Sequence, residues 1–400
     1  GTNPGDAEGN SSLPAVYLPI GKNPVKATIP VFMWTDAIVR GKDMTDITDG
    51  MRGVKKLDHD IKMIVNSGGN TMINQHSDSN ATDKILRDTS KCEFIVVCDN
   101  MMTPTCRYAD ILLPDVLGPE TDDIACQGGS NGGTTSMLPM HKAVEPQWDQ
   151  KTSYEICRLI AKEQEFTEGR TQLQWLEWCY NETRKKVPQL PDWDTFWKGG
   201  PAQVYGWRKN PVALSEFRAD PVKNPLKTPS GKIEIYSERL NNIANTWKLK
   251  PGDVISPIPV YFRNWEMYGD DLQKKYPLQC YGFHHHGRIH STFHNLPWLR
   301  EQHPDVVFIN VLDAKARGIN NGDLVQIFND RGIVELPAKV TSRIMPGVVS
   351  IPQGAWYTPV KKNGKVVDIG GNINTLTSLR PSPLAKGNPQ HTNLVEVRKA

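Results

Sequence analysis

The sequence lacks the features that mark a membrane-spanning or nucleic-acid-binding chain. Its longest apolar runs, such as residues 94–97, are far shorter than the roughly 20 residues of a membrane-spanning helix. The 47 Lys and Arg nearly balance the 44 Asp and Glu, and no basic block stands out, so we expect no nucleic-acid partner. Residues 1–12 contain neither a basic nor an apolar stretch, so we expect no export signal in this chain.

The cysteines also lack a pattern. There are seven, scattered along the chain, and no two stand in a C-x-x-C motif. An odd, scattered set argues against a disulfide framework, a zinc site or an iron–sulfur motif, and favours buried thiols without a special role. What the sequence does have is length and loop-forming residues. Its 400 residues suggest two or three domains, and its 30 Pro and 32 Gly predict many turns.

An α/β unit is the first organised region. Residues 61–65 and 94–98 are short apolar runs rich in β-branched residues and bounded by turn residues, as expected of buried parallel strands. Between them, residues 80–88 predict a short helix with Asn80 as its N-cap. This spacing predicts one β–α–β crossover, and residues 111–114 follow as a third strand.

Polar residues and a glycine pair follow the first two strands, in segments 66–70 (NSGGN) and 98–105 (CDNMMTPT). Ligands of open parallel sheets bind beyond the carboxyl ends of the strands, so these segments are candidates for a nucleotide site. The candidate residues are Asn66, Gly68, Gly69, Asn70, Asp99 and Thr103. Neither segment matches the G-x-G-x-x-G or P-loop motif, so an ordinary tight turn explains them equally well.

The C-terminal third is rich in short strand-like runs. A helical middle region precedes it, with a capping box at Thr152 and Glu155. The predicted strands are residues 305–310, 324–328, 333–340, 347–351 and 394–397. These strands are short and closely spaced, with a single short helix at residues 313–318. They therefore favour a small closed barrel, which leaves no sheet edge exposed.

A polar loop of 23 residues, 370–392, precedes the last strand. It holds three Gly, three Pro and only five apolar residues, so it cannot bury much apolar surface of its own. A small barrel does not need such a loop for stability, whereas long ordered loops in compact domains are usually functional. We therefore expect this loop to take part in a binding site.

Residues 281–292 (YGFHHHGRIHST) form a second conspicuous segment. Consecutive strand residues point to opposite faces, so the three histidines 284–286 cannot converge on one metal ion. Arg288 and His290, beside Ser291, suit an anion such as phosphate better, because they combine positive charge with a hydroxyl donor. A solvated polar loop remains the alternative.

Five segments taken together resemble, in this order, the molybdopterin oxidoreductase family, and most of all its anaerobic dimethyl sulfoxide reductases. They are residues 109–115 (ADILLPD), 228–237 (TPSGKIEIYS), 318–332 (GINNGDLVQIFNDRG), 346–356 (PGVVSIPQGAW) and 374–392 (NTLTSLRPSPLAKGNPQHT). The resemblance covers nearly the whole chain. It implies an open parallel α/β region, part of a larger domain, followed by a double-psi β-barrel.

The resemblance also implies a domain division and a cofactor. Residues 1–225 would be the α/β region with a helical insertion, 226–274 a connecting segment, and 275–400 the barrel that binds the dinucleotide. The implied cofactor is molybdenum in bis(molybdopterin guanine dinucleotide). The residues expected to bind it are Asn66, Gly68, Gly69, Asn70, Asp99, Thr103, Asp110, Arg288, His290, Ser291, Gln353, Trp356, Asn372, Asn374, His391 and Thr392.

Activity and partners are implied in the same way. The family's dimethyl sulfoxide reductases reduce S-oxides or N-oxides in anaerobic respiration. They work with an iron–sulfur electron-transfer subunit and a membrane anchor subunit on the periplasmic side of the bacterial inner membrane. The family's iron–sulfur motif and molybdenum ligand have no counterpart in this sequence, so we expect a C-terminal half that is inactive alone and carries no catalytic or metal-ligating residue. The alternative is a non-catalytic, barrel-containing binding or assembly module.

Overall fold

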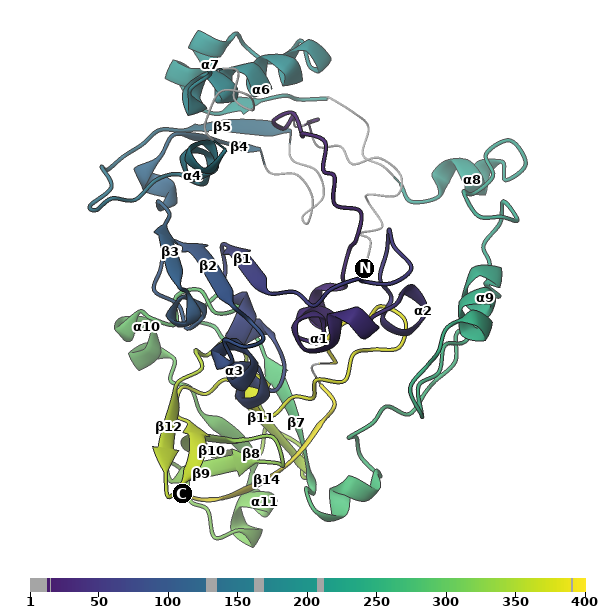
Figure 1. The fold of residues 1–400 in the computed structure, drawn as a ribbon, viewed down its shortest axis with the longest axis vertical. Helices are drawn as coiled ribbons and strands as arrows, with labels where there is room; N and C mark the ends of the chain where they lie inside the picture. The colour runs from purple at the N-terminus through teal and green to yellow at the C-terminus, as the bar shows by residue number, and fades with distance from the viewer. Residues whose placement is uncertain (1–12, 15, 127–134, 162–168, 207–211, 390) are drawn as a thin grey trace. The chain divides into compact units, whose positions relative to one another are not determined.

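The computed structural model describes residues 13–14, 16–126, 135–161, 169–206, 212–389 and 391–400. The segment 1–12, for which we expected no export signal, lies outside them. The chain forms two compact units (Figure 1). One contains the residues up to Pro24 together with Leu113–Ile235, and the other contains Val25–Leu112 and Tyr236–Ala400. The three-part division expected from the sequence stays a prediction.

The second unit contains a closed barrel of six strands (Figure 1). The strands are β7 (Leu278–Phe283), β8 (Val307–Asn310), β9 (Leu324–Phe328), β10 (Ile333–Thr341), β11 (Val348–Pro352) and β14 (Asn393–Lys399). Around the ring the order is β10, β8, β11, β7, β14, β9 and back to β10. The β10–β8 and β11–β7 pairs are parallel and the others antiparallel. The predicted closed barrel is confirmed.

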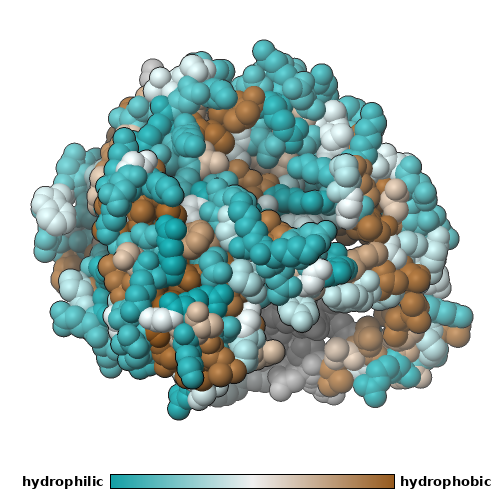
Figure 2. Space-filling view, turned by 90° about the horizontal axis from the view of Figure 1, so that it is seen from below, coloured by the Kyte–Doolittle hydropathy of each residue, from teal (hydrophilic) through white to brown (hydrophobic). Residues whose placement is uncertain are grey.

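Alternating apolar residues fill the interior of the barrel. Val325 and Ile327 of β9 are fully buried, and so are Val349 and Ile351 of β11. Successive strand residues point to opposite faces, so every second residue reaches the same interior. The face of the molecule in Figure 2 is mostly hydrophilic, with hydrophobic residues in scattered patches. The alternation of side chains along each strand, with a period of two residues, therefore decides which of them are buried in the barrel.

Three strands of the second unit were not predicted. One is β7, whose end overlaps segment 281–292, for which we expected an anion site or, alternatively, a solvated polar loop. The others are β12 (Pro359–Lys362) and β13 (Lys365–Asp368), a hairpin whose second strand pairs with β10. The hairpin turns at Asn363 and Gly364, where φ is +49° and +75°. An Asn-Gly pair favours this turn, so the sequence did contain a signal for the hairpin.

A three-stranded sheet lies in the same unit. Its strands are β1 (Met63–Ser67), β2 (Phe94–Asp99) and β3 (Ile111–Pro114), and α3 (Ser79–Arg87) connects the first two, which are parallel. The β–α–β unit is confirmed, but β1 begins two residues later than predicted. The predicted N-cap of α3 was wrong: Asp78, not Asn80, accepts the N–H of Ala81, at 3.1 Å. Asn80 lies inside the helix and donates to the carbonyl of Arg331.

The first unit combines a small antiparallel sheet with helices. These elements are β4 (Asp123–Cys126), β5 (Ser136–Met140), β6 (Ala202–Gln203), α4 (Ser153–Ile160), α6 (Gln172–Lys186), α7 (Trp193–Gly199) and α8 (Ser215–Ala219). Thr152 accepts the N–H of Glu155, so the predicted N-cap residue of α4 is confirmed. Tyr180 and Phe196 stack in the core, with ring centroids 4.2 Å apart.

Short helices complete the second unit. They are α1 (Trp34–Arg40), α2 (Asp46–Asp49), α9 (Glu238–Thr246), α10 (Pro297–Gln302) and α11 (Val311–Ala316). Across the described ranges of the chain, no helix combines the length and apolar character needed to cross a membrane.

The barrel core makes a first prediction. Replacing Ile327, whose exposed fraction is 0%, with Ala removes buried methyl groups and leaves a cavity, so the free energy of unfolding should fall by about 2–5 kcal/mol. The control is Met345→Ala in the same unit, where the side chain is 71% exposed and the change should stay within about 0.5 kcal/mol. Urea denaturation of both variants measures the difference. Equal midpoints would contradict the assignment of Ile327 to the core.

Candidate functional site

A cavity of about 400 Å³ lies in the second unit, where the turn after β1 meets the ends of the barrel strands β7 and β11. Seven residues named from the sequence line it: Gly69, Asn70, His290, Ser291, Gln353, Asn374 and His391. They come from four separate segments of the chain. The position agrees with the rule that ligands of open sheets bind beyond the carboxyl ends of the strands.

The turn after β1 offers a buried polar atom to this cavity. The side-chain oxygen of Asn70 accepts hydrogen bonds from the N–H and the hydroxyl of Thr105, at 3.1 and 2.9 Å. Its amide nitrogen is buried and has no partner among the residues that the structure describes. An unpaired buried donor costs about 1–3 kcal/mol, so this nitrogen indicates a ligand that accepts a hydrogen bond.

The neighbouring glycines leave room for that ligand. Gly68 and Gly69 have φ of +71° and +85°, and a Cβ at Gly68 would meet no atom within 4 Å. The side chain of Asn66 fixes this turn, because it donates to the carbonyl of Gly69 at 3.0 Å and accepts from the hydroxyl of Thr71. Backbone groups here can therefore approach a ligand closely.

The polar loop is buried over residues 370–377, although its sequence predicts a coil that cannot bury itself. Ile373 and Leu376 pack into the barrel core, and hydrogen bonds hold the polar residues around them. Asn374 donates to the carbonyl of Asn74 at 2.6 Å, and Asn372 donates to the hydroxyl of Ser79 at 3.0 Å. The predicted role of this loop in the site is supported for Asn374, which lines the cavity, whereas Asn372 holds the loop against α3.

Asn74 was missed in the sequence. It lines the cavity, donates to the carbonyl of Ala355 at 2.6 Å and accepts the N–H of Tyr357 at 2.9 Å. It therefore joins the segment after β1 to the segment after β11. Asn74 lies in a single π-helical turn, Thr71–Gln75, for which no sequence motif exists. The available signal was the amide pair Asn74 and Gln75, a few residues after the NSGGN segment.

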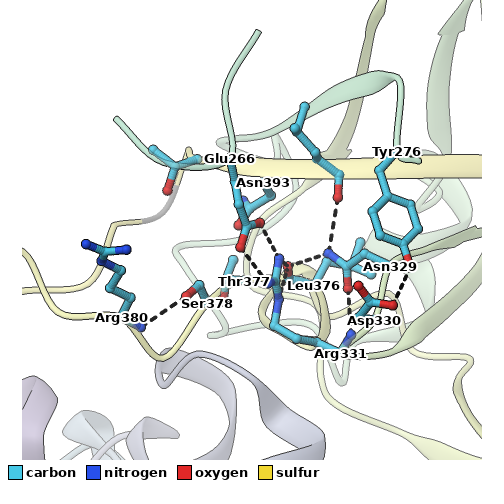
Figure 3. Close-up of polar contacts among 12 residues, drawn as sticks. Glu266, Tyr276, Asn329, Asp330, Arg331, Leu376, Thr377, Ser378, Arg380 and Asn393 are labelled. Carbon is cyan, nitrogen blue, oxygen red and sulfur yellow. Dashed lines mark hydrogen bonds and ion pairs between the residues drawn. The ribbon is translucent and has the colours of Figure 1, made fainter. Parts of the chain in front are cut away.

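The end of the buried stretch 370–377 is held through the carbonyl of Leu376 (Figure 3). This oxygen accepts three N–H donors: Nε and one Nη of Arg331, at 2.9 and 2.7 Å, and the amide of Asn329 at 2.9 Å. The guanidinium of Arg331 also forms a two-point ion pair with Glu266, at 2.7 and 2.6 Å. The carboxylate of Glu266 thus compensates the charge of Arg331, while N–H groups of the guanidinium hold the carbonyl of Leu376.

The phosphate-binding role expected of Arg288 is not supported by its contacts. The side chain is 1% exposed, and its guanidinium donates to both carboxylate oxygens of Asp305, at 2.7 and 3.0 Å. It also donates to the carbonyl of Gln353 at 3.0 Å and contacts His294, whose pKa burial lowers to about 4. These partners occupy most of its donors, so Arg288 supports Gln353, and its contact with a ligand stays a prediction.

Six other expected residues do not line the cavity. They are Gly68, Asp99, Thr103, Asp110, Trp356 and Thr392. Asp110 accepts the N–H of Ile95 at 2.7 Å and so joins the start of β3 to β2. Trp356 donates to the carbonyl of Ser291 at 2.8 Å and so holds a cavity wall. Thr103 is buried against Cys106. Contact of these residues with the cofactor stays a prediction.

A close backbone approach at the cavity wall makes a second prediction. A Cβ at Gly354, where φ is +88°, would lie 1.8 Å from the carbonyl oxygen of His290. Gly364→Ala is the control, because its φ of +75° is similar but a Cβ there meets nothing within 4 Å.

The control should cost about 1–2 kcal/mol of unfolding free energy, from the left-handed conformation alone. Gly354→Ala should cost about 1–3 kcal/mol more, because the wall must move. Chemical denaturation gives both values, and equal losses would contradict the close approach.

The fold and the site define the class of protein. Residues 25–163 match the family model described as Molybdopterin oxidoreductase, and residues 278–394 match that of the Molydopterin dinucleotide binding domain. The first match contains the parallel sheet and the second contains most of the barrel. The chain therefore belongs to the molybdopterin oxidoreductase family, whose cofactor is molybdenum held by a molybdopterin dinucleotide.

Particular relatives agree with this assignment. Dimethyl sulfoxide reductase DmsA of Escherichia coli (strain K12) is 51% identical over 403 residues, which cover 100% of this chain and 49% of that protein. Trimethylamine-N-oxide reductase 1 of the same organism is 33% identical over 407 residues, which cover 98% of this chain and 46% of that protein. The chain thus spans about half the length of the curated relatives that it matches.

A solved structure shows the same fold. Acetylene hydratase from Pelobacter acetylenicus superimposes with a TM-score of 0.67 over 93% of this chain and 46% of that one, at 19% sequence identity. At this identity the likeness shows the fold alone.

Proposed function

We propose that this chain is the dinucleotide-binding part of a molybdenum-dependent reductase of S-oxides or N-oxides. The observation that carries the proposal is the buried amide nitrogen of Asn70, which lacks a partner among the described residues, in a cavity lined by further amides. The family matches name the kind of ligand, and the relatives named for dimethyl sulfoxide and trimethylamine N-oxide reduction suggest the substrates.

The cavity residues fit the chemistry of such a cofactor. A pterin and a guanine both present ring N–H groups and carbonyl oxygens, and a side-chain amide can donate and accept. Asn374 and Gln353 would face the pterin, with His290 and Ser291 beside it. The NSGGN turn, with Asn70, would hold the guanosine end, where we also expect Asp99. Because each unpaired polar atom in a dry site costs about 1–3 kcal/mol, these groups must be held rigidly.

The proposal also includes details of the cofactor, of the barrel topology and of the domain division. They are a bis(guanine dinucleotide) form of the cofactor, double-psi topology of the barrel, and the division at residues 225 and 275. The closed mixed barrel and the match of residues 278–394 support the last two.

The cofactor and the residues of this chain would have different roles in the reaction. When bound, the cofactor supplies the two-electron chemistry that removes oxygen from the substrate. The residues of this chain bind the dinucleotide, orient it and exclude water from it. As a part of a longer reductase, the chain would work with an iron–sulfur subunit and a membrane anchor subunit on the periplasmic side of the inner membrane.

A matched pair of asparagine variants tests the proposal in the full-length protein. Asn374→Ala removes a cavity amide and should lower the molybdenum and molybdopterin content about tenfold, the effect of losing about 1.4 kcal/mol of binding free energy. Asn181→Ala, in α6 of the first unit, should leave the content within about twofold. Elemental analysis and pterin fluorescence measure the content, and dye-linked assays with dimethyl sulfoxide and trimethylamine N-oxide measure the activity.

Two results would contradict the proposal. Equal cofactor content in both variants would remove Asn374 from the site. A wild-type protein that contains no molybdopterin, even when its host makes the cofactor, would favour the non-catalytic binding module instead.

A further inference from the structure

Asp368 is a buried carboxylate that none of the roles above uses. It is the last residue of β13, and its exposed fraction is 0%. One oxygen accepts the backbone N–H groups of Thr358 and Gly370, at 2.8 and 2.9 Å. The other accepts the N–H of Asn372 at 2.7 Å and the hydroxyl of Thr375 at 3.4 Å. All four donors are neutral, and three of them lie in the polar loop.

The contacts of Asp368 continue into the cavity wall. The N–H of Asn372 is fixed by Asp368, and the side-chain oxygen of Asn372 accepts the N–H of Asn374 at 3.1 Å. The side chain of Asn374 then lines the cavity and donates to the carbonyl of Asn74. The place of Asn374 in the cavity therefore depends on a backbone that Asp368 holds.

We propose that Asp368 is a positioning residue of the cofactor cavity, whose carboxylate fixes the backbone of residues 370–375 so that Asn374 faces the cofactor. The fixing of the loop stands on its own, whereas its consequence for the cofactor rests on the proposed function. A carboxylate suits this task because each of its two oxygens accepts two hydrogen bonds. Asparagine has one acceptor oxygen, so in either orientation its NH₂ group faces at least one backbone N–H.

The charge of Asp368 makes the closed loop sensitive to pH. Burial raises the pKa of this carboxyl to about 6, above its ordinary value near 3.8. The closed loop thus binds a proton more tightly than the open loop does. The four hydrogen bonds favour the carboxylate, but the cost of burying its charge outweighs them, so protonation stabilises closure. This contribution is fully present below about pH 3.8 and is lost as the pH rises through about 6.

Titratable groups on the elements around Asp368 could also make the loop sensitive to pH. Tyr357 has a pKa that burial raises and that the charge of Asp368 raises further. On α3, Asp83 accepts the hydroxyl of Tyr108, and at the N-cap the pKa of Asp78 is raised by burial. On β10, Glu335 is paired with Lys362 of β12. Of these, Asp78 is the one that could imitate the effect of Asp368.

Amide hydrogen exchange tests the fixing of the loop without any ligand. The sample is the full-length protein, purified from a host that cannot make molybdopterin. In Asp368→Ala, the backbone N–H groups of Gly370 and Asn372 lose their acceptor, so protection of residues 370–375 should fall about tenfold or more, while β9 stays within about twofold. The control is Asp330→Ala, which removes a carboxylate that contacts Lys275 and Tyr276 outside the loop. Unchanged protection in Asp368→Ala would overturn the proposal.

The pH dependence separates Asp368 from a merely structural residue. After correction for intrinsic exchange, wild-type loop protection should rise about tenfold between about pH 7.5 and pH 5, as a pKa near 6 requires. Asp368→Asn, the second variant in case the Ala variant does not fold, should show no such rise, whereas Asp78→Asn should keep it. A rise of the same size in Asp368→Asn would overturn the assignment of the charge to Asp368.

The cofactor content of the loaded protein completes the test. Asp368→Ala should contain about tenfold less molybdopterin than the wild type, as Asn374→Ala does. If the loop loses protection while the molybdopterin content is unchanged, the positioning role is overturned. If Asn374→Ala also keeps its content, the failure lies with the proposed site itself, because the exchange result does not depend on any ligand.

Discussion

The hydrogen bond from the side chain of Asn374 to the carbonyl of Asn74 joins the two structural parts of the second unit. One partner follows β1, the first strand of the parallel sheet, and the other precedes the last barrel strand, 300 residues later in the chain. Asn74 in turn ties down the segment after β11 through Ala355 and Tyr357. The cavity exists because these amides hold three distant segments at fixed spacing.

Hydrogen bonds fix the polar residues of this loop, in addition to the packing of Ile373 and Leu376 into the barrel core. Apolar packing is tolerant of small shifts, whereas hydrogen bonds weaken steeply with misalignment. The buried stretch 370–377 is fixed at one end by Asp368 and at the other through the carbonyl of Leu376, with Arg331 and Glu266 behind it. A ligand with many ring donors and acceptors requires partners placed with this accuracy, so the loop's polarity and its burial have the same cause.

The sequence predicted the elements whose signal is local. The strands β9 and β10 and the cap at Thr152 follow from period, composition and capping chemistry, and they were placed correctly. The Asn-Gly pair at 363–364 was an equally local signal, but the hairpin of β12 and β13 was not predicted from it. The cavity residue Asn74 and the ion pair of Arg288 with Asp305 could not be predicted, because each depends on a neighbour brought close only by the fold.

The order of strands around the barrel has a consequence for the protein's synthesis. β14 fills the position between β7 and β9, so the ring stays open until residues 393–399 have left the ribosome. Until then β7 and β9 each present an unpaired edge, which other chains can pair with. The loop of Asn374 directly precedes β14, so pairing of β14 with β7 and β9 also fixes the C-terminal end of this loop. The interval before β14 pairs is therefore the period in which the chain needs protection from aggregation.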